Sequence, residues 1–127
     1  MTQVVVLGHG GYAQGMKGNI AMLLGEIEGF HFLDFDISED LETFKERLNE
    51  TVLQIGKDPI LFVCDLTGGS PFREACLITS EHNDYVVVGG INTAGFSEIA
   101  FLLEKSPDEL SKLAVEASIE AIMVFKI

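Results

Sequence analysis

Short apolar runs alternate along the chain with longer segments in which apolar residues recur every three or four positions. Unbroken runs of aliphatic and aromatic residues are typical of strands that are covered on both faces of a sheet. Glycine or polar residues follow each run and indicate turns at the strand ends. Four runs therefore predict strands, at Val4–Leu7, Phe30–Phe35, Pro59–Cys64 and Tyr85–Val88.

The segments between the first three runs predict two helices. The first carries its apolar face from Tyr12 to Ile27, where glycines follow. We expect Ser38 to cap the second helix, which ends at Gly56, because hydroxyl side chains at such a position accept a hydrogen bond from the first turn. The expected buried stripe of this helix is Leu41, Phe44, Leu48, Val52 and Ile55.

Three more helices are predicted in the second half of the chain. Ser70 followed by Pro71 indicates an N-cap and a proline at the first helical position. Apolar residues at Ile99–Leu103 suggest a short helix, and Ser106–Glu109 has the sequence of a capping box that begins the last one.

Strands and helices alternate throughout, without a linker or an internal repeat. This order favours right-handed crossovers between parallel strands. We therefore predict an α/β fold formed by a single three-layer domain over residues 1–127, with a mainly parallel sheet and helices on both faces. The apolar segment Met123–Ile127 is expected to add a short C-terminal edge strand.

The charge balance argues against two classes of partner. Eight Lys and Arg residues stand against 20 Asp and Glu residues, which gives a formal net charge of −12. Such a surface repels nucleic-acid phosphates and anionic lipid. No apolar stretch approaches the roughly 20 residues that span a bilayer, and no signal peptide is recognisable, so neither nucleic-acid binding nor membrane insertion is expected, and we predict a cytoplasmic protein.

The cysteine pattern fits such a compartment. Cys64 lies in an apolar run and Cys76 in a helical pattern, with no Cys-x-x-Cys spacing. We therefore expect both to be buried free thiols rather than a disulfide or a zinc site.

Two polar residues follow apolar strands and are the first candidates for chemistry. His9 ends the first run and Asp65 ends the third, and ligands of open α/β sheets bind at the carboxyl ends of the strands. If these strands are neighbours, a carboxylate beside the ring fixes the imidazole tautomer and frees the other ring nitrogen as a nucleophile. Each residue alone would be read as an ordinary turn residue.

The segment after Asp65 supplies groups that bind anions. Thr67 and Ser70 carry hydroxyls, and backbone N–H groups after Gly68 and Gly69 stand at the start of a helix. Together with His9 they predict a phosphohistidine site. The sequence offers no cluster of metal ligands, and His31 and His82 have no companions at metal-ligand spacing.

These motifs resemble the EIIA component of mannose-type sugar phosphotransferase systems over essentially the whole chain. The resemblance rests on Gly8-His9-Gly10, on the more specific segment Asp65–Phe72 and on Val88–Asn92. The chain departs from the family at Thr93–Phe96, where the family commonly has a run rich in leucine and proline.

The resemblance implies a function and its partners. His9 would be phosphorylated on Nε2 by the phosphocarrier HPr and would pass the phosphoryl group to an EIIB component, with Asp65 as the orienting carboxylate and Ser70 on the phosphate side. No metal or other cofactor is expected, because the donor is itself a phosphohistidine. Members of the family form homodimers through a C-terminal strand at the sheet edge, which implies the same here.

Of two other interpretations, one remains open and the residues argue against the second. Gly8–Ala13 also satisfies the dinucleotide pattern G-x-G-x-x-[GA] after a strand, with Asp34 or Asp36 at the position of a ribose-binding acid. A small dinucleotide-binding module is therefore the alternative. A serine hydrolase built on Ser70 is disfavoured, since Pro71 has no N–H for an oxyanion hole.

Overall fold

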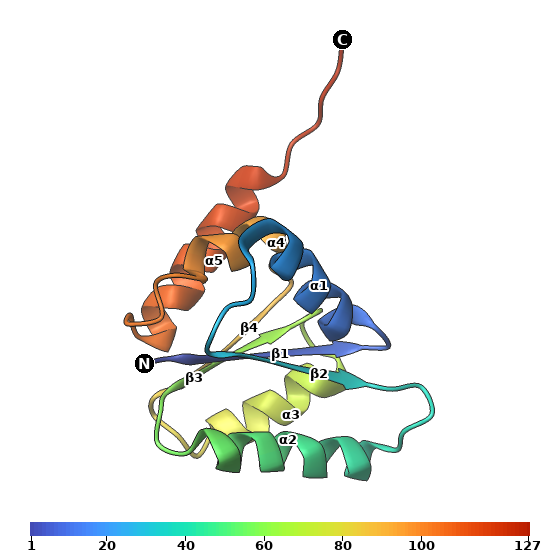
Figure 1. Cartoon of the computed structure of the whole chain (residues 1–127). Coiled ribbons are helices and arrows are strands. Elements are labelled where there is room, and N and C mark those ends of the chain that lie inside the picture. Colours follow the sequence, from blue (N-terminus) through green and yellow to red (C-terminus); the bar gives the residue numbers. More distant parts are fainter.

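A computed structural model describes all residues, 1–127 (Figure 1). Four strands and five helices follow one another in the order β1 (Gln3–His9), α1 (Tyr12–Leu24), β2 (Phe30–Phe35), α2 (Leu41–Ile55), β3 (Ile60–Cys64), α3 (Ser70–Thr79), β4 (Tyr85–Gly89), α4 (Thr93–Ile99) and α5 (Pro107–Ala121). None of the helices combines the length and hydropathy needed to cross a bilayer.

The strands form one parallel sheet in the order β2-β1-β3-β4. This confirms the predicted α/β class and the parallel sheet. Because β1 lies between β2 and β3, the residues that end these three strands meet at one edge of the sheet. The pairing register places His9 opposite Phe35 of β2, and on the other side Asp65 follows the last residue of β3.

Helices cover both faces of the sheet, as predicted, because successive residues of the buried strands point to opposite sides (Figure 1). Val4 and Val6 of β1 face α1, α4 and α5, and Val5 and Leu7 face α2 and α3. All four side chains are fully buried. Burial of this kind, at about 25 cal/mol per Å² of apolar surface, is the main force that holds the three layers together.

Two helices begin at residues other than those predicted. Asp40 caps α2 in place of Ser38: its backbone is extended and its carboxylate accepts a hydrogen bond from Thr43 N–H at 2.8 Å. The Ser38 hydroxyl donates instead to Asp36 within the preceding loop. Gly69 is the N-cap of α3, so Ser70 is the first helical residue and its side chain caps no N–H group.

The predicted short helix at Ile99–Leu103 lies too late in the chain. Helix α4 begins at Thr93 because Asn92 caps it, with its side-chain oxygen accepting from Gly95 N–H at 3.3 Å. Asn92 Nδ2 also donates to the Ser118 carbonyl of α5, which fixes α4 against that helix. Helix α1 likewise ends earlier than predicted, at Leu24. The predicted capping box of α5, between Ser106 and Glu109, is confirmed.

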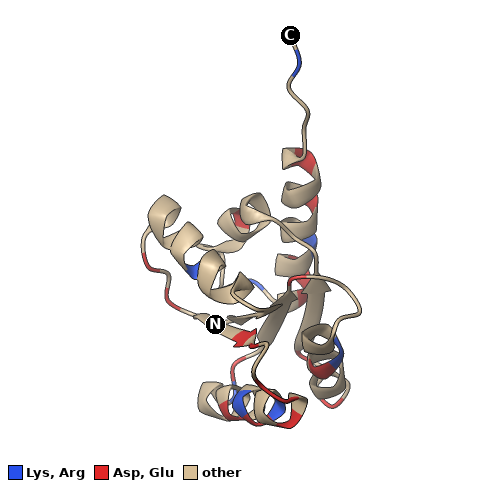
Figure 2. Cartoon of the chain, turned by 90° about the vertical axis from the view of Figure 1, so that its right-hand side faces the viewer, with Lys and Arg blue, Asp and Glu red and all other residues tan.

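Two further predictions differ from the structure. The predicted C-terminal edge strand is absent from the single chain: residues Met123–Ile127 have no regular structure and extend from the end of α5 away from the sheet, where no strand lies to pair with them (Figures 1 and 2). Cys64 is a buried free thiol as predicted, whereas Cys76 is exposed, because it lies on the outward side of α3.

Candidate functional site

His9 and Asp65 lie in direct contact at the edge of the sheet where β1 and β3 end. Their ring nitrogen Nδ1 and carboxylate oxygen Oδ2 are 2.8 Å apart. The His9 side chain is 42% exposed and the Asp65 side chain only 13% exposed. The ring is therefore open to a partner while its carboxylate neighbour is shielded from solvent.

Backbone hydrogen bonds hold the Asp65 carboxylate in place. Oδ2 accepts from the His9 backbone N–H at 2.9 Å as well as from the ring, and Oδ1 accepts from Leu66 N–H at 2.9 Å. The Asp65 N–H in turn donates to the Leu7 carbonyl of β1 at 3.0 Å. The carboxylate is thus built into the junction of two central strands, and its direction toward the ring is fixed.

This contact sets the chemistry of the imidazole. A carboxylate only accepts hydrogen bonds, so in the neutral ring the proton lies on Nδ1 and Nε2 carries the lone pair. The same carboxylate stabilises a positive charge that develops on the ring. In this arrangement Nε2 is the ring nitrogen whose lone pair can act as a nucleophile.

The loop between β3 and α3 brings the start of a helix to the Cε1 and Nε2 side of the His9 ring. Gly69 is so close to the ring that a Cβ at this position would lie 2.7 Å from Cε1 and 3.2 Å from Nε2 of His9. The first backbone hydrogen bond of α3 joins Arg73 N–H to the Gly69 carbonyl, which leaves the N–H groups of Ser70 and Phe72 without a partner in the helix. These groups and the helix dipole favour an anion beside Nε2.

The other predicted phosphate-side residues belong to the same loop. Thr67 packs against β4: a Cβ at Gly89 would lie 2.7 Å from its Oγ1. Gly68 turns the chain toward α3 with a φ of +89°. Ser70 starts the helix with a hydroxyl that has no capping role.

Burial and the charge of the Asp65 carboxylate raise the pKa values of two neighbouring groups. Burial, and then the charge of Asp65, raises the pKa of the Cys64 thiol to about 12, and the same two causes raise the pKa of the Tyr12 phenol to about 12. Both groups therefore stay protonated and neutral at physiological pH, and neither provides a thiolate or phenolate nucleophile.

The Asp34 side chain occupies the N–H groups at the start of α1, where a dinucleotide would place its pyrophosphate. Its two carboxylate oxygens accept from the N–H groups of Ala13 at 2.7 Å and Gln14 at 3.1 Å, in the first turn of α1. In a dinucleotide-binding fold this helix end holds the pyrophosphate, and the acid at the end of the second strand holds the ribose. Here the acid occupies the phosphate position itself, which argues against the dinucleotide interpretation.

The remaining histidines lie away from this edge. His31 Nε2 lies 2.9 Å from Gln3 Oε1, and its pKa is lowered by burial. His82 stacks on the Tyr85 ring with a centroid distance of 4.0 Å. No group of three His, Cys, Asp or Glu side chains is arranged to hold a metal ion.

Sequence reasoning missed two contributions from β2. The centroids of the Phe35 and His9 rings are 6.3 Å apart. The Asp34 carboxylate caps the start of α1 and does not serve as a ligand-binding acid. A parallel pairing of β1 with β2 would have placed both residues beside the Gly8-His9 turn. That pairing was not apparent in the local pattern.

Comparison with known protein families gives one match over nearly the whole chain. The family model described as "PTS system fructose IIA component" matches residues 3–123. The mannose-specific EIIAB component of Escherichia coli K12 is 35% identical over 130 residues, which cover 99% of this chain and 40% of that protein. The chain thus spans well under half the length of this relative. The fructose-specific EIIA component of Bacillus subtilis is 26% identical over 82% of this chain and 72% of its own length.

Solved structures share the fold of this chain over nearly its whole length. The mannose/sorbose-specific IIA subunit from Enterococcus faecalis superimposes with a TM-score of 0.90 at 22% identity, covering 99% of this chain and 96% of that one. An EIIA component from Streptococcus agalactiae gives a TM-score of 0.88 at 23% identity, with 98% and 97% coverage. At these identities the likeness is one of fold.

Proposed function

Because the chain belongs to the family of PTS system fructose IIA components, we propose that it carries a phosphoryl group from phosphorylated HPr to an EIIB component for sugar uptake. His9 is the proposed acceptor and Asp65 its orienting partner. The observation that carries this proposal is the 2.8 Å contact between His9 Nδ1 and Asp65 Oδ2, which leaves Nε2 free on a side chain that is 42% exposed.

The proposed step is an exchange of one nitrogen–phosphorus bond for another. The Nε2 lone pair of His9 attacks the phosphorus of the donor phosphohistidine, and the bond between that phosphorus and the donor nitrogen breaks. The donor ring keeps the bonding electron pair. His9 becomes a phosphorylated imidazolium whose positive charge is balanced by Asp65, and transfer to EIIB reverses these events at the next acceptor.

The loop at the start of α3 provides the proposed site for the transferred group. Gly69 brings the backbone up to Nε2, and the N–H groups of the first helical turn, which have no partner in the helix, follow it in the chain. Hydroxyls of Thr67 and Ser70 are the proposed side-chain contacts. In-line transfer needs positioning and charge stabilisation more than any further covalent chemistry, and these groups supply both without a metal ion.

Incubation with phosphoenolpyruvate, Enzyme I and HPr, followed by intact mass measurement, tests this function. One acid-labile, alkali-stable phosphoryl adduct is expected, and only when HPr is present. Unchanged mass under conditions that phosphorylate HPr would exclude the proposed role.

Replacing Gly69 by alanine is expected to block phosphoryl transfer while preserving the fold. The backbone of Gly69 has φ −75° and ψ 175°, which alanine adopts without strain. The added methyl group, however, would collide with the His9 ring beside Nε2. Since a misplacement of about 1 Å costs about 100-fold in rate, the transfer rate from phospho-HPr, measured by rapid quench, should fall by at least about that factor.

Gly15→Ala is the matched control for this change. Gly15 lies in α1, and a Cβ there meets no atom within 4 Å. Its transfer rate should equal that of the unmodified protein, and its melting temperature should rise slightly, because alanine is favoured over glycine in a helix. Equal rates for Gly69→Ala and Gly15→Ala would mean that the space beside Nε2 is not used.

We also propose a symmetric dimer that covers the C-terminal tail. Residues Ile122–Phe125 and Ile127 are strongly exposed and apolar, and Lys126 is the one charged residue among them. Val115 and Ile119 continue this exposed surface along α5. An exposed apolar surface of this length favours aggregation of a monomer. Exchange of an end segment between two identical chains is a simple way to bury it.

Deleting residues 123–127 is expected to weaken dimerisation and leave His9 phosphorylatable. The tail contributes much of the exposed apolar surface, yet it lies far from the carboxyl ends of the strands in Figure 1. Sedimentation at micromolar concentration should show a dimer for the full chain and mainly monomer for the truncated one. A tail of the same length with serine at its apolar positions should behave like the deletion. A monomeric full chain would end this part of the proposal.

A further inference from the structure

The first helix of the protein starts immediately after the reactive histidine and is capped from another strand. Its own N-cap residue, Gly11, has no side chain to offer. Asp34, at the end of β2, supplies the cap instead: one carboxylate oxygen accepts from Ala13 N–H at 2.7 Å and the other from Gln14 N–H at 3.1 Å. The turn after His9 is thereby tied to β2 at its far end.

A second bond ties the middle of the same turn to β2. Gly10 N–H donates to the Phe35 carbonyl at 3.0 Å, and the Phe35 ring packs near the His9 ring. Gly10 has a φ of +60°, a left-handed conformation that glycine reaches easily and also leaves easily. The turn is therefore held in this conformation by contacts from outside rather than by its own residues.

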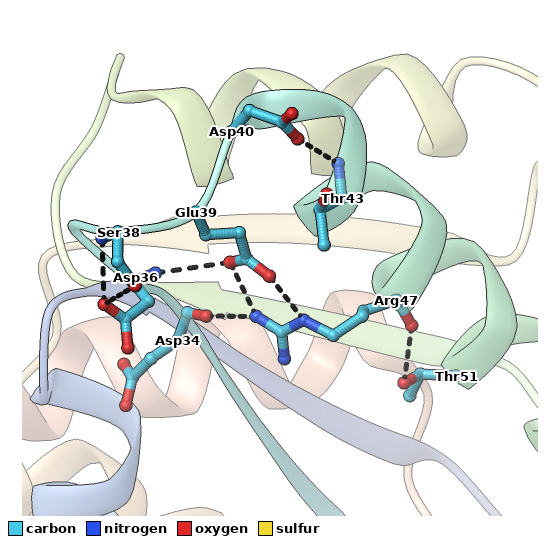
Figure 3. Close-up of polar contacts among 8 residues, drawn as sticks. All are labelled: Asp34, Asp36, Ser38, Glu39, Asp40, Thr43, Arg47 and Thr51. Carbon is cyan, nitrogen blue, oxygen red and sulfur yellow. Dashed lines mark hydrogen bonds and ion pairs between the residues drawn. The ribbon is translucent and has the colours of Figure 1, made fainter.

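Asp34 is itself anchored by a charged cluster, drawn in Figure 3. Arg47 of α2 donates from Nη2 to the Asp34 carbonyl at 2.5 Å. The same guanidinium forms two hydrogen bonds of 2.8 Å with Glu39, which lower the pKa of that carboxyl and hold the arginine in place. Because Arg47 binds the carbonyl of Asp34 and not its carboxylate, the carboxylate can point toward α1 (Figure 3).

We propose that Asp34 is a positioning residue for His9: by capping α1 it fixes the backbone turn that carries the imidazole, as Asp65 fixes the ring. The inference rests on the proposed phosphoryl transfer. Asp65 reaches the ring only if the His9 backbone stays in register between β2 and β3. With the cap removed, the Gly10-Gly11 turn gains conformations in which Nε2 points away from the phosphate site.

The test compares Asp34→Ala and Asp34→Asn with Asp36→Asn. Asp36 lies two residues further on, and its carboxylate accepts hydrogen bonds from the Ser38 N–H and hydroxyl in its own loop, so its replacement removes the same charge and leaves the cap of α1 in place. Transfer from phospho-HPr is expected to slow about tenfold in Asp34→Ala, since partial loss of alignment costs less than the about 100-fold of a full 1 Å displacement. Asp34→Asn keeps one acceptor oxygen, so its transfer rate should lie between those of Asp34→Ala and the unmodified protein. The transfer rate of Asp36→Asn should match that of the unmodified protein.

Nitrogen-15 NMR provides a readout that does not need phosphorylation. The unmodified protein should show one His9 signal set, with the proton on Nδ1 and protected amides at Ala13 and Gln14. Asp34→Ala should broaden or split the His9 ring signals, and, because it removes a helix cap, it should also lower the melting temperature by a few degrees. If the protein is not phosphorylated at all, the proposed function fails while this spectrum still decides the role of Asp34. An Asp34→Ala variant with native transfer rate, or with an unchanged His9 spectrum, would overturn the inference.

Discussion

Replacing His9 by alanine is expected to abolish the phosphoryl adduct entirely. The two other histidines are engaged elsewhere, His31 with Gln3 and His82 against Tyr85, and neither lies at the edge where α3 begins. No other side chain at this edge offers a comparable nucleophile, because burial and the charge of Asp65 raise the pKa of Cys64 to about 12. Intact mass after incubation with phosphoenolpyruvate, Enzyme I and HPr should show no added phosphoryl group.

His82→Ala serves as the matched control for this change. His82 is exposed in the loop before β4, so its removal costs one stacking contact and leaves the site untouched. This variant should gain the adduct at the normal rate. A phosphoryl group that persists in His9→Ala, or disappears in His82→Ala, would place the acceptor elsewhere.

Replacing Asp65 by asparagine is expected to slow phosphoryl transfer severely, by up to about 10⁴-fold, the loss that triad enzymes show for the same change. The carboxylate accepts from Leu66 N–H through one oxygen and from two groups of His9 through the other. An amide has a single oxygen, so in either orientation its NH₂ group faces a backbone donor. When the NH₂ group faces His9, Nδ1 must accept, the proton moves to Nε2, and the nucleophilic lone pair is lost.

The ring tautomer distinguishes this mechanism from loss of structure. Nitrogen-15 chemical shifts of His9 should report a proton on Nδ1 in the unmodified protein, and a population with the proton on Nε2 in Asp65→Asn, where the amide NH₂ faces His9. Thermal unfolding measured on the same samples shows how much of the effect comes from the buried amide. A native transfer rate in Asp65→Asn would reduce Asp65 to a residue that only shapes the turn.

The alternating pattern of apolar runs and helical faces was enough to predict the class of fold. Val4–Leu7 and Ile60–Cys64 are buried on both faces, and short runs of this composition are typical of strands at the centre of a covered sheet. The location of His9 and Asp65 at strand ends was also readable, because parallel strands direct their carboxyl ends to one edge. Their contact depended on one further fact, that β1 and β3 are neighbours.

Helix starts were less predictable than helices. Ser38, Asp40, Ser70 and Gly69 are all acceptable near a helix N-terminus by residue type. Asp40 caps α2 because its carboxylate reaches Thr43 N–H, while Ser38 finds a nearer partner in Asp36. This choice depends on the conformation of the loop, which local propensity does not encode.

The sequence by itself determined the α/β architecture and placed His9, Asp65 and the glycine-rich loop at the ends of strands, because each of these depends on periodicity or residue type within a few positions. Only the tertiary structure decided that β2 lies against β1, so that Asp34 caps α1 and Phe35 borders His9. Those contacts join residues about 20 or more positions apart, and they form only when burial of both sheet faces outweighs the entropy of bringing distant segments together.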